Sequence, residues 1–422
     1  MVSIFILLIA TPLFAAVDLK EAIQRSILNS PVIKVKEGGL KTTELESATA
    51  RSQWLPSLDL SAKHGVSKYH RPSPTAPWES EVGLTLTENL YDNGKTLNQS
   101  RVANLKVDNA KLELEREKAD LTRKVVSEFY RYSLAMKLGT TREEQFSLLK
   151  IQYENIANQY RQGMRTRNDY LRFKNQLLRA EIETNSAKLS REKSELELHR
   201  LIALREEEKL EFQPIEPFAH LEPESPNRLD PKGTYDFKLS EIEIRIKEVE
   251  VRLAEREYWP GLFVSVGAGY NNSGYLGGNG GFGQNEQFGA NALLGIKFNL
   301  WDWGIRRRDI EIADTKKNMA AQTSQDILLK ARALVRSLET SVETARKNLL
   351  LTTQLLKAEE ENYNSISTQY REGKLAYLDL ITSLNDFLDA KLRHYAASFG
   401  LAEDLASIHF NQGNIYEFYT GT

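Results

Sequence analysis

Apolar residues recur with helical spacing along four long segments of the chain. In one segment they lie seven residues apart, the spacing of a coiled-coil seam: Leu328, Val335, Val342, Leu349 and Leu356. No proline occurs between Pro77 and Pro214 or after Pro260, so no proline breaks a helix in these stretches. The pattern predicts four long helices, at about 95–162, 165–204, 305–372 and 375–409.

Four shorter segments alternate apolar and polar residues with a period of two, which predicts β-strands at about 57–69, 80–91, 261–272 and 286–301. In the last of these, Leu294 and Ile296 share one face, and Gly295 and Lys297 share the other. Alternation is typical of a tilted membrane strand with lipid on one side and a lumen on the other. A soluble antiparallel sheet packed on a core produces the same pattern.

The number of predicted strands limits what such a sheet can form. Two hairpins supply four strands, whereas the smallest membrane barrels need about eight. An open sheet edge in lipid leaves backbone groups unpaired at a cost of several kcal/mol each. If the strands span a membrane, the protein must therefore oligomerise. A dimer would supply eight strands, and a trimer would supply twelve and leave an aqueous bore.

The chain also contains an internal duplication with a constant offset of 210 residues. Leu-Tyr-Asp-Asn-Gly at 90–94 returns as Leu-Trp-Asp-Trp-Gly at 300–304, and Tyr-x2-Ile-x2-Gln-Tyr-Arg-x-Gly at 153–163 returns at 363–373. Several matches at one offset indicate a duplicated unit, ordered as helix, hairpin, long helix, turn and long helix. We place the parts as a first repeat at 17–210, a proline-rich linker at 211–233, a second repeat at 234–410 and a C-terminal tail at 411–422.

The N-terminus and the composition narrow the protein class further. Residues 2–10 are almost purely apolar and small residues follow, which predicts a secretory signal peptide at 1–16; a buried N-terminal element is the alternative. Mean hydropathy is -0.46, which excludes a polytopic helical membrane protein. The absence of cysteine excludes thiol catalysis, disulfides and a lipid anchor on cysteine. A net charge of -2 gives no field for nucleic acid, and the six histidines lack metal-ligand spacing, so we expect no cofactor, no metal and no enzyme.

Together these motifs resemble the outer-membrane efflux proteins, the TolC-like outer-membrane factors, over about residues 18–410. The resemblance implies a mainly α fold with a β-barrel portion: a homotrimer in which a twelve-stranded outer-membrane barrel continues into a long periplasmic α-helical coiled-coil tunnel. It also implies a passive exit duct for tripartite efflux or type I secretion. The implied partners are outer-membrane lipid, a periplasmic adaptor (membrane fusion protein) and an inner-membrane pump or ABC transporter.

The two predicted helix–helix turns are candidate contact sites. Each turn contains a glycine midway between two long helices, Gly163 and Gly373, because glycine permits the left-handed backbone of a tight turn. The residues that follow would form exposed tips, and by the resemblance they would meet the adaptor: Met164 and Arg165 in the first turn, Lys374 and Leu375 in the second. The alternative is a solvated turn without a partner.

Asp169 and Asp379 lie six residues after the two glycines. In a threefold tunnel, one inward Asp per chain would form a ring of carboxylates that favours cations. The resemblance places Asp379 at the periplasmic aperture, with Thr382 where a second acidic ring is often found. It also pairs Tyr370 with Asp169 to hold the aperture shut, and Leu375 replaces an arginine of this lock. The alternative for both Asp residues is a favourable interaction with a helix N-terminus.

A second functional class fits the helical stripes equally well. An exported coiled-coil structural or adhesion protein with a small soluble sheet would show the same periodicities. The two classes differ in a simple observable, because the channel would be a detergent-requiring trimer and the adhesion protein would be soluble.

Overall fold

The computed structural model describes residues 17–66, 78–203, 210–216, 229–273, 286–372, 374–375 and 377–421. The predicted signal peptide at 1–16 lies outside these residues. The chain divides into two compact units. One unit comprises Met1–Glu37, Glu113–Lys238 and Leu328–Thr422, and the other comprises Gly38–Leu112 and Leu239–Ile327.

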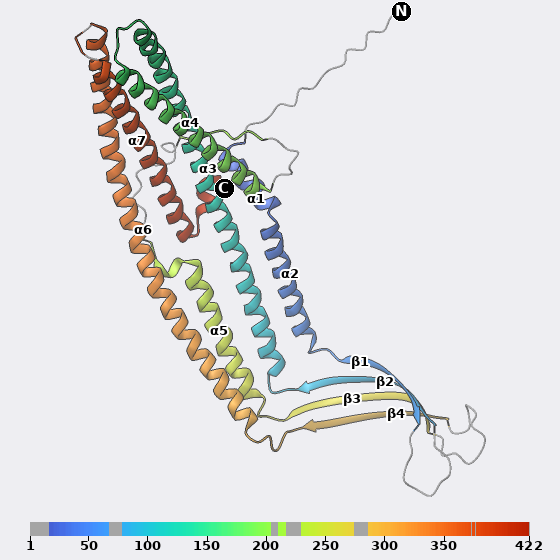
Figure 1. Cartoon of the computed structure of the whole chain (residues 1–422). Helices are drawn as coiled ribbons and strands as arrows, with labels where there is room; N and C mark the ends of the chain where they lie inside the picture. The colour runs from blue at the N-terminus through green and yellow to red at the C-terminus, as the bar shows by residue number, and fades with distance from the viewer. Residues whose placement is uncertain are drawn as a thin grey trace, which may run out of the picture. The chain divides into compact units, whose positions relative to one another are not determined.

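Helices make up most of the described chain, in the order shown in Figure 1. The first repeat contains α1 (Leu19–Asn29), α2 (Pro31–Ser52), α3 (Lys95–Arg161) and α4 (Arg167–Ile202). The second contains α5 (Tyr235–Arg256), α6 (Ile305–Arg371), α7 (Tyr377–Gln412) and α8 (Ile415–Thr420), preceded by the short 3-10 helix η2 (Pro231–Gly233). The helices α3 and α6 each have 67 residues, and α4 and α7 each have 36. Equal lengths of corresponding helices are expected when the two halves of a chain are copies of one unit. None of the described helices is long and apolar enough to cross a membrane.

The four strands form one antiparallel sheet in the order β1 (Ser57–Val66), β2 (Trp78–Tyr91), β3 (Gly261–Ser273) and β4 (Glu286–Lys297). The central pair joins the two repeats, because β2 of the first pairs with β3 of the second. The strand predicted at 286–301 ends at Lys297 in the structure. Beyond it the Asn299 carbonyl accepts a hydrogen bond from the Arg306 guanidinium at 2.7 Å, so this residue bonds to the following helix rather than to a strand.

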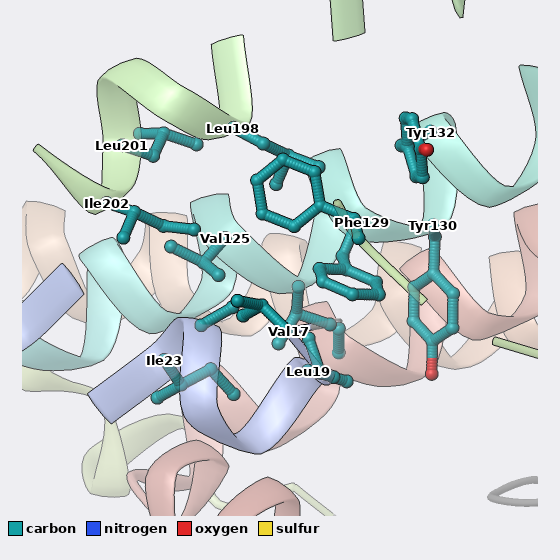
Figure 2. Packing of buried hydrophobic residues seen from close by; sticks show 14 of the residues in the cluster. Val17, Leu19, Ile23, Val125, Phe129, Tyr130, Tyr132, Leu198, Leu201 and Ile202 are labelled. Carbon is teal, nitrogen blue, oxygen red and sulfur yellow. The ribbon is translucent and has the colours of Figure 1, made fainter. Parts of the chain in front are cut away.

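The largest core cluster lies in the first unit, where α1, α3 and α4 meet (Figure 2). Its centre is Phe129, Tyr130 and Val125 of α3, which are almost wholly buried. The segment at 210–216 contributes Phe212, whose ring meets that of Phe129 edge-on with centroids 5.9 Å apart. Helix α8 contributes Ile415. Residues that we assigned to a linker and a tail thus take part in the core.

A backbone bridge holds the linker segment against the first residues of the described chain. Val17 and Phe212 form an isolated parallel bridge, in which Val17 N donates to Glu211 O at 2.8 Å and Gln213 N donates to Val17 O at 3.1 Å. A second apolar cluster packs α3 and α4 on α7 close to the helix turns, with Ile156, Phe173 and Ile381 among its buried members. This cluster fixes the helix ends that carry the predicted site residues.

Candidate functional site

The sheet has one continuous apolar face. Directly opposed residues of antiparallel neighbours lie on the same face, and the register aligns Leu60 with Leu84, Leu84 with Ala268 and Ala268 with Ala290. The apolar face comprises Leu58, Leu60, Ala62, Val82, Leu84, Leu86, Leu262, Val264, Val266, Ala268, Tyr270, Phe288, Ala290, Ala292, Leu294 and Ile296, with His64, Ser80, Glu88, Asn272 and Glu286 as its polar members.

Side chains on this apolar face are exposed. Leu60 is 71 % exposed, Leu294 70 % and Ile296 74 %. A soluble sheet packed on its own core would bury such residues. Within the described chain, the apolar face is therefore an uncovered surface that needs an apolar environment.

The opposite, polar face comprises Ser57, Asp59, Ser61, Lys63, Glu81, Gly83, Thr85, Thr87, Asn89, Gly261, Ser265, Gly267, Gly269, Asn271, Gln287, Gly289, Asn291, Gly295 and Lys297, with Phe263 and Leu293 as its apolar members. At the end of the sheet nearest the helices, this face borders an open cavity of about 960 Å³. Thr87, Phe263 and Lys297 line the cavity on the strand side, and Asp92 and Asp302 line it on the helix side.

The sheet also has two outer edges, β1 and β4, which have no further strand beside them in the described chain. Their outward N–H and C=O groups lack a ladder partner. Such edges are tolerated in water but not in lipid, where each unpaired backbone group costs several kcal/mol. A sheet with an apolar exposed face and two open edges is thus incomplete as a single chain.

Both repeats use the same turn to pass from strand to long helix. Asn93 and Gly94 have φ of 58° and 79°, and Trp303 and Gly304 have φ of 56° and 77°. The preceding aspartate caps the helix: Asp92 accepts from Gly94 N at 3.0 Å and from Thr96 N at 2.7 Å. Asp302 likewise accepts from Gly304 N at 3.0 Å and from Arg306 N at 3.2 Å. The Asp-x-Gly motif therefore sets the direction of each long helix where it leaves the sheet.

The surroundings of the two capping carboxylates differ. At Asp302, the Arg306 side chain donates from Nε at 2.5 Å, and this hydrogen bond is the main cause of a lowered pKa. At Asp92, burial alone would raise the pKa, but hydrogen bonds from the Thr96 side chain and the turn backbone outweigh burial and lower it. Both caps thus favour the ionised carboxylate.

The first helix turn, between α3 and α4, is closed by backbone and side-chain hydrogen bonds. Gly163 has φ of +75°, its N–H donates to Tyr160 O at 3.0 Å, and Met164 N donates to Gln159 O at 2.9 Å, which is a Schellman motif. Thr166 then starts α4 in a capping box with Asp169, whose backbone N–H donates to Thr166 Oγ1 at 3.2 Å. Met164 is 66 % exposed, and Arg165 is exposed and donates to Gln159 Oε1 at 3.0 Å.

The second helix turn repeats the main backbone bond, since Lys374 N donates to Gln369 O at 2.9 Å. Gly373 lies outside the described residues. Lys374 is exposed and forms an ion pair with Glu372 at 2.7 Å, and Leu375 is half-buried. The two turns therefore present different charge, because the basic side chain of the second turn is matched by a neighbouring carboxylate.

The predicted aperture residues lie on the helix ends beside these turns. Asp379 is exposed in the first turn of α7, and Thr382 is exposed with its hydroxyl donating to Leu378 O at 2.9 Å. Tyr370 is half-buried in the last turn of α6. Asp169 accepts hydrogen bonds from the Thr166 hydroxyl at 2.9 Å and the Thr166 N–H at 3.4 Å, so it has the helix-capping role that we gave as the alternative. Its pairing with Tyr370 stays a prediction.

The structure adds a tyrosine cluster that sequence reasoning missed. The hydroxyls of Tyr153 and Tyr170 lie 3.0 Å apart, and the rings of Tyr160 and Tyr170 stack with centroids 5.1 Å apart. In the second repeat, Tyr363 instead stacks on Phe387 at 5.6 Å. Tyr153 and Tyr363 are equivalent by the 210-residue offset, and this recurrence was the available signal. Elsewhere among the described residues, His, Asp and Glu side chains form no group of three or more that could hold a metal ion.

Comparison with known proteins gives one family and several related folds. The sequence matches the model of a family described as outer membrane efflux protein over residues 22–204 and 235–409. These segments correspond to the two repeats. No curated protein matches the chain.

Among solved structures, the chain is similar to the CmeC outer membrane channel of Campylobacter jejuni, with a TM-score of 0.81 and 14 % identity over 94 % of this chain and 86 % of that one. It is similar to the outer membrane protein VceC of Vibrio cholerae, with a TM-score of 0.79 and 16 % identity over 94 % and 96 %. The chain is also similar to the open state of the MtrE outer membrane channel of Neisseria gonorrhoeae. The TM-score is 0.77 and the identity is 16 %, over 96 % of this chain and 91 % of that one. These similarities confirm the predicted mainly helical, duplicated fold.

Proposed function

This chain belongs to the outer membrane efflux protein family, and from that premise we propose that three copies form a passive exit duct for tripartite efflux or type I secretion. Family membership and location in the outer membrane are confirmed predictions. The proposed duct conducts substrates from a periplasmic adaptor and an inner-membrane pump or ABC transporter to the exterior. No bond is made or broken by the duct itself.

The observation that carries this proposal is the incomplete sheet. Its apolar face is exposed and both edges lack a partner strand in the described chain. Pairing β4 of one copy with β1 of the next would satisfy the edges and turn the apolar face to lipid. Three sheets of four strands would close a barrel wide enough for an aqueous bore, lined by the polar face.

The helices also favour an oligomer. Helix α4 carries a stripe of exposed apolar residues: Leu171, Leu178, Ile182, Leu189 and Leu196. Ile182 is 65 % exposed although it lies in the middle of a 36-residue helix. A coiled-coil stripe of this kind is stabilised by packing against another helix. In the proposed trimer, helices of neighbouring copies cover the stripe.

The oligomer can be tested on the protein extracted from membranes in detergent. We expect a trimer by light scattering and ion-conducting channels in planar bilayers. Leu294→Arg places a charge on the apolar face and should destabilise the barrel by about 2–4 kcal/mol, with loss of trimer. Asn291→Arg on the polar face of the same strand is the matched control and should retain the trimer. A monomer in the soluble fraction would instead support the adhesion protein.

For the periplasmic end we propose a gate at the helix turns. Asp379 and Thr382 line the aperture, Tyr370 and Asp169 hold it closed, and adaptor binding at the turns splays the helix ends apart. The adaptor contacts are Gly163, Met164 and Arg165 in one turn and Gly373, Lys374 and Leu375 in the other. Support comes from the exposed side chains of Met164, Arg165, Lys374 and Asp379.

The gate is tested by combining Tyr370→Phe with Asp169→Ala and recording single channels in planar bilayers. We expect a higher conductance, because the closing hydrogen bond is removed from each copy. Tyr160 occupies the position of the first repeat that corresponds to Tyr370, so Tyr160→Phe is the matched control and should leave conductance unchanged. Equal conductance in the wild type and the double variant would count against this gate.

A further inference from the structure

Glycine is concentrated on one face of the β3–β4 hairpin. On the polar face, four of the six directly opposed pairs contain glycine: Gly261–Lys297, Phe263–Gly295, Gly267–Asn291 and Gly269–Gly289, but not Ser265–Leu293 and Asn271–Gln287. On the other face, the six directly opposed pairs contain none: Leu262–Ile296, Val264–Leu294, Val266–Ala292, Ala268–Ala290, Tyr270–Phe288 and Asn272–Glu286. Glycine weakens a strand interior, so its restriction to one face calls for a reason on that face.

The reason is visible at Gly295, where a neighbouring ring occupies the space of a side chain. A Cβ atom at Gly295 would lie 2.4 Å from Cζ and 2.7 Å from Cε1 of Phe263. Both distances are far below van der Waals contact, so the ring lies across the opposed strand, directly over the glycine. The ring is half-buried although it sits on the open face of the sheet.

A second opposed pair shows the same arrangement. A Cβ atom at Gly267 would lie 2.5 Å from Oδ1 of Asn291, so the Asn291 amide also lies across its partner strand. Gly289, which shares this face and the strand of Gly295, behaves differently, because nothing lies within 4 Å of its Cβ position. The hairpin thus contains glycines that accommodate a neighbouring side chain and a glycine that does not.

We propose that Gly295 helps to set the width of the bore by letting the tip of the Phe263 ring occupy the space of the missing side chain, against the barrel wall. This inference rests on the proposed trimeric duct, in which the polar face lines the lumen. Phe263 already borders the open cavity on that face, together with Thr87 and Lys297. Any side chain at Gly295 displaces the ring, and a lumen-facing residue can move only into the bore, because the sheet backbone closes the other side. Three copies of the displaced ring narrow the channel at one level.

The test compares two alanine substitutions on the same strand and the same face. Gly295→Ala and Gly289→Ala each add one methyl group, but only the first displaces a ring. In purified trimers in planar bilayers, we expect Gly295→Ala to lower single-channel conductance by about a third and Gly289→Ala to change it by less than about a tenth, since conductance follows the free cross-section of the pore.

A double variant identifies the displaced ring as the cause. Adding Phe263→Ala to Gly295→Ala should restore wild-type conductance, because no ring remains to be moved. If Gly295→Ala prevents trimer assembly, the same double variant should restore the heat-modifiable trimer on gels. Failure of this rescue overturns the inference, as does equal conductance in Gly295→Ala and Gly289→Ala.

The failure of this inference can be distinguished from failure of the duct itself. A wild-type protein that forms no conducting trimer overturns the exit duct and this inference with it. A conducting wild type in which the two alanine variants behave alike overturns only the role of Gly295.

Discussion

The long helices α3 and α6 are equivalent in the two repeats and equal in length, yet they are packed differently. Phe129 of α3 is fully buried, whereas Glu339, the residue 210 positions later in α6, is exposed. Tyr130 and Thr340 differ in the same way. The comparison shows that the repeats share helix length, while their side chains have diverged.

The divergence has a structural cause in the segments that cover α3. Helix α1, residues 210–216 and helix α8 all contribute to the cluster around Phe129. The corresponding cluster on α6 is smaller, with Val335, Val342 and Ile408 among its buried members. More segments pack against α3 than against α6, where, among the described residues, Leu229 is the one buried member of the cluster from outside α6 and α7, so α3 has the large aromatic residues at this level.

The largest expected effect tests this difference in packing. Phe129→Ala should lower the free energy of unfolding by about 3–5 kcal/mol, because it removes a fully buried ring and leaves a cavity. Glu339→Ala, at the equivalent exposed position, should change it by less than about 0.5 kcal/mol. Denaturant titrations followed by circular dichroism of the detergent-solubilised protein measure both. Similar losses for the two variants would mean that the two helices are packed alike after all.

Much of the architecture could be predicted from the sequence because its determinants are local. The Asp-x-Gly turns and Pro31 mark element boundaries directly, and alternation along each strand predicted which residues share a face. The roles of Phe212 and Ile415 could not be predicted in this way. Both residues reach the core through contacts between segments far apart in the chain, and a proline-rich or terminal segment shows no periodicity that would reveal such contacts.

The turn at Gly163 provides a smaller test of what the repeats share. Gly163→Ala should destabilise the protein by about 1 kcal/mol, because alanine is strained in the left-handed conformation at φ of +75°. Gly139, inside the same helix α3, also has open space around its Cβ position, but its φ is not positive. Gly139→Ala should therefore stabilise by about 0.5–1 kcal/mol.

If thermal melts show a lower melting temperature for Gly163→Ala and a higher one for Gly139→Ala, the backbone geometry of the turn, and not a lack of space, requires Gly163. A Gly163→Ala variant that is as stable as the wild type, or more stable, would show that the turn tolerates a side chain and that the shared motif has another origin. Some parts of the candidate site could also be predicted from the sequence and others could not. The spacing of residues along the sequence located the turns. The contacts of Tyr153 with Tyr170 and of Phe263 with Gly295 could not be found in this way, because each depends on how two separate elements are aligned with each other.

The smallest expected effect concerns the two capping carboxylates, which share backbone geometry but not surroundings. Arg306 lowers the pKa of Asp302 below its ordinary value of 3.8, so the ionised form stabilises the folded state. That contribution is fully present above the unfolded pKa and is lost as pH falls through the folded pKa. The melting temperatures of the wild type and Asp302→Asn should therefore differ by a constant amount above about pH 5 and converge below about pH 4.

Arg306→Gln sharpens this last comparison because it removes the main cause of the lowered pKa while retaining the Asp302 cap. We expect the pH-dependent part of the melting-temperature difference between wild type and Asp302→Asn to become smaller in the Arg306→Gln background and to end at a higher pH, because the folded pKa of Asp302 then lies closer to its unfolded value. Asp92 owes its lowered pKa to Thr96 and the turn backbone, which outweigh burial. The difference in melting temperature between the wild type and Asp92→Asn should therefore have the same pH dependence with and without Arg306→Gln. A change in that pH dependence would show that the two caps do not act independently.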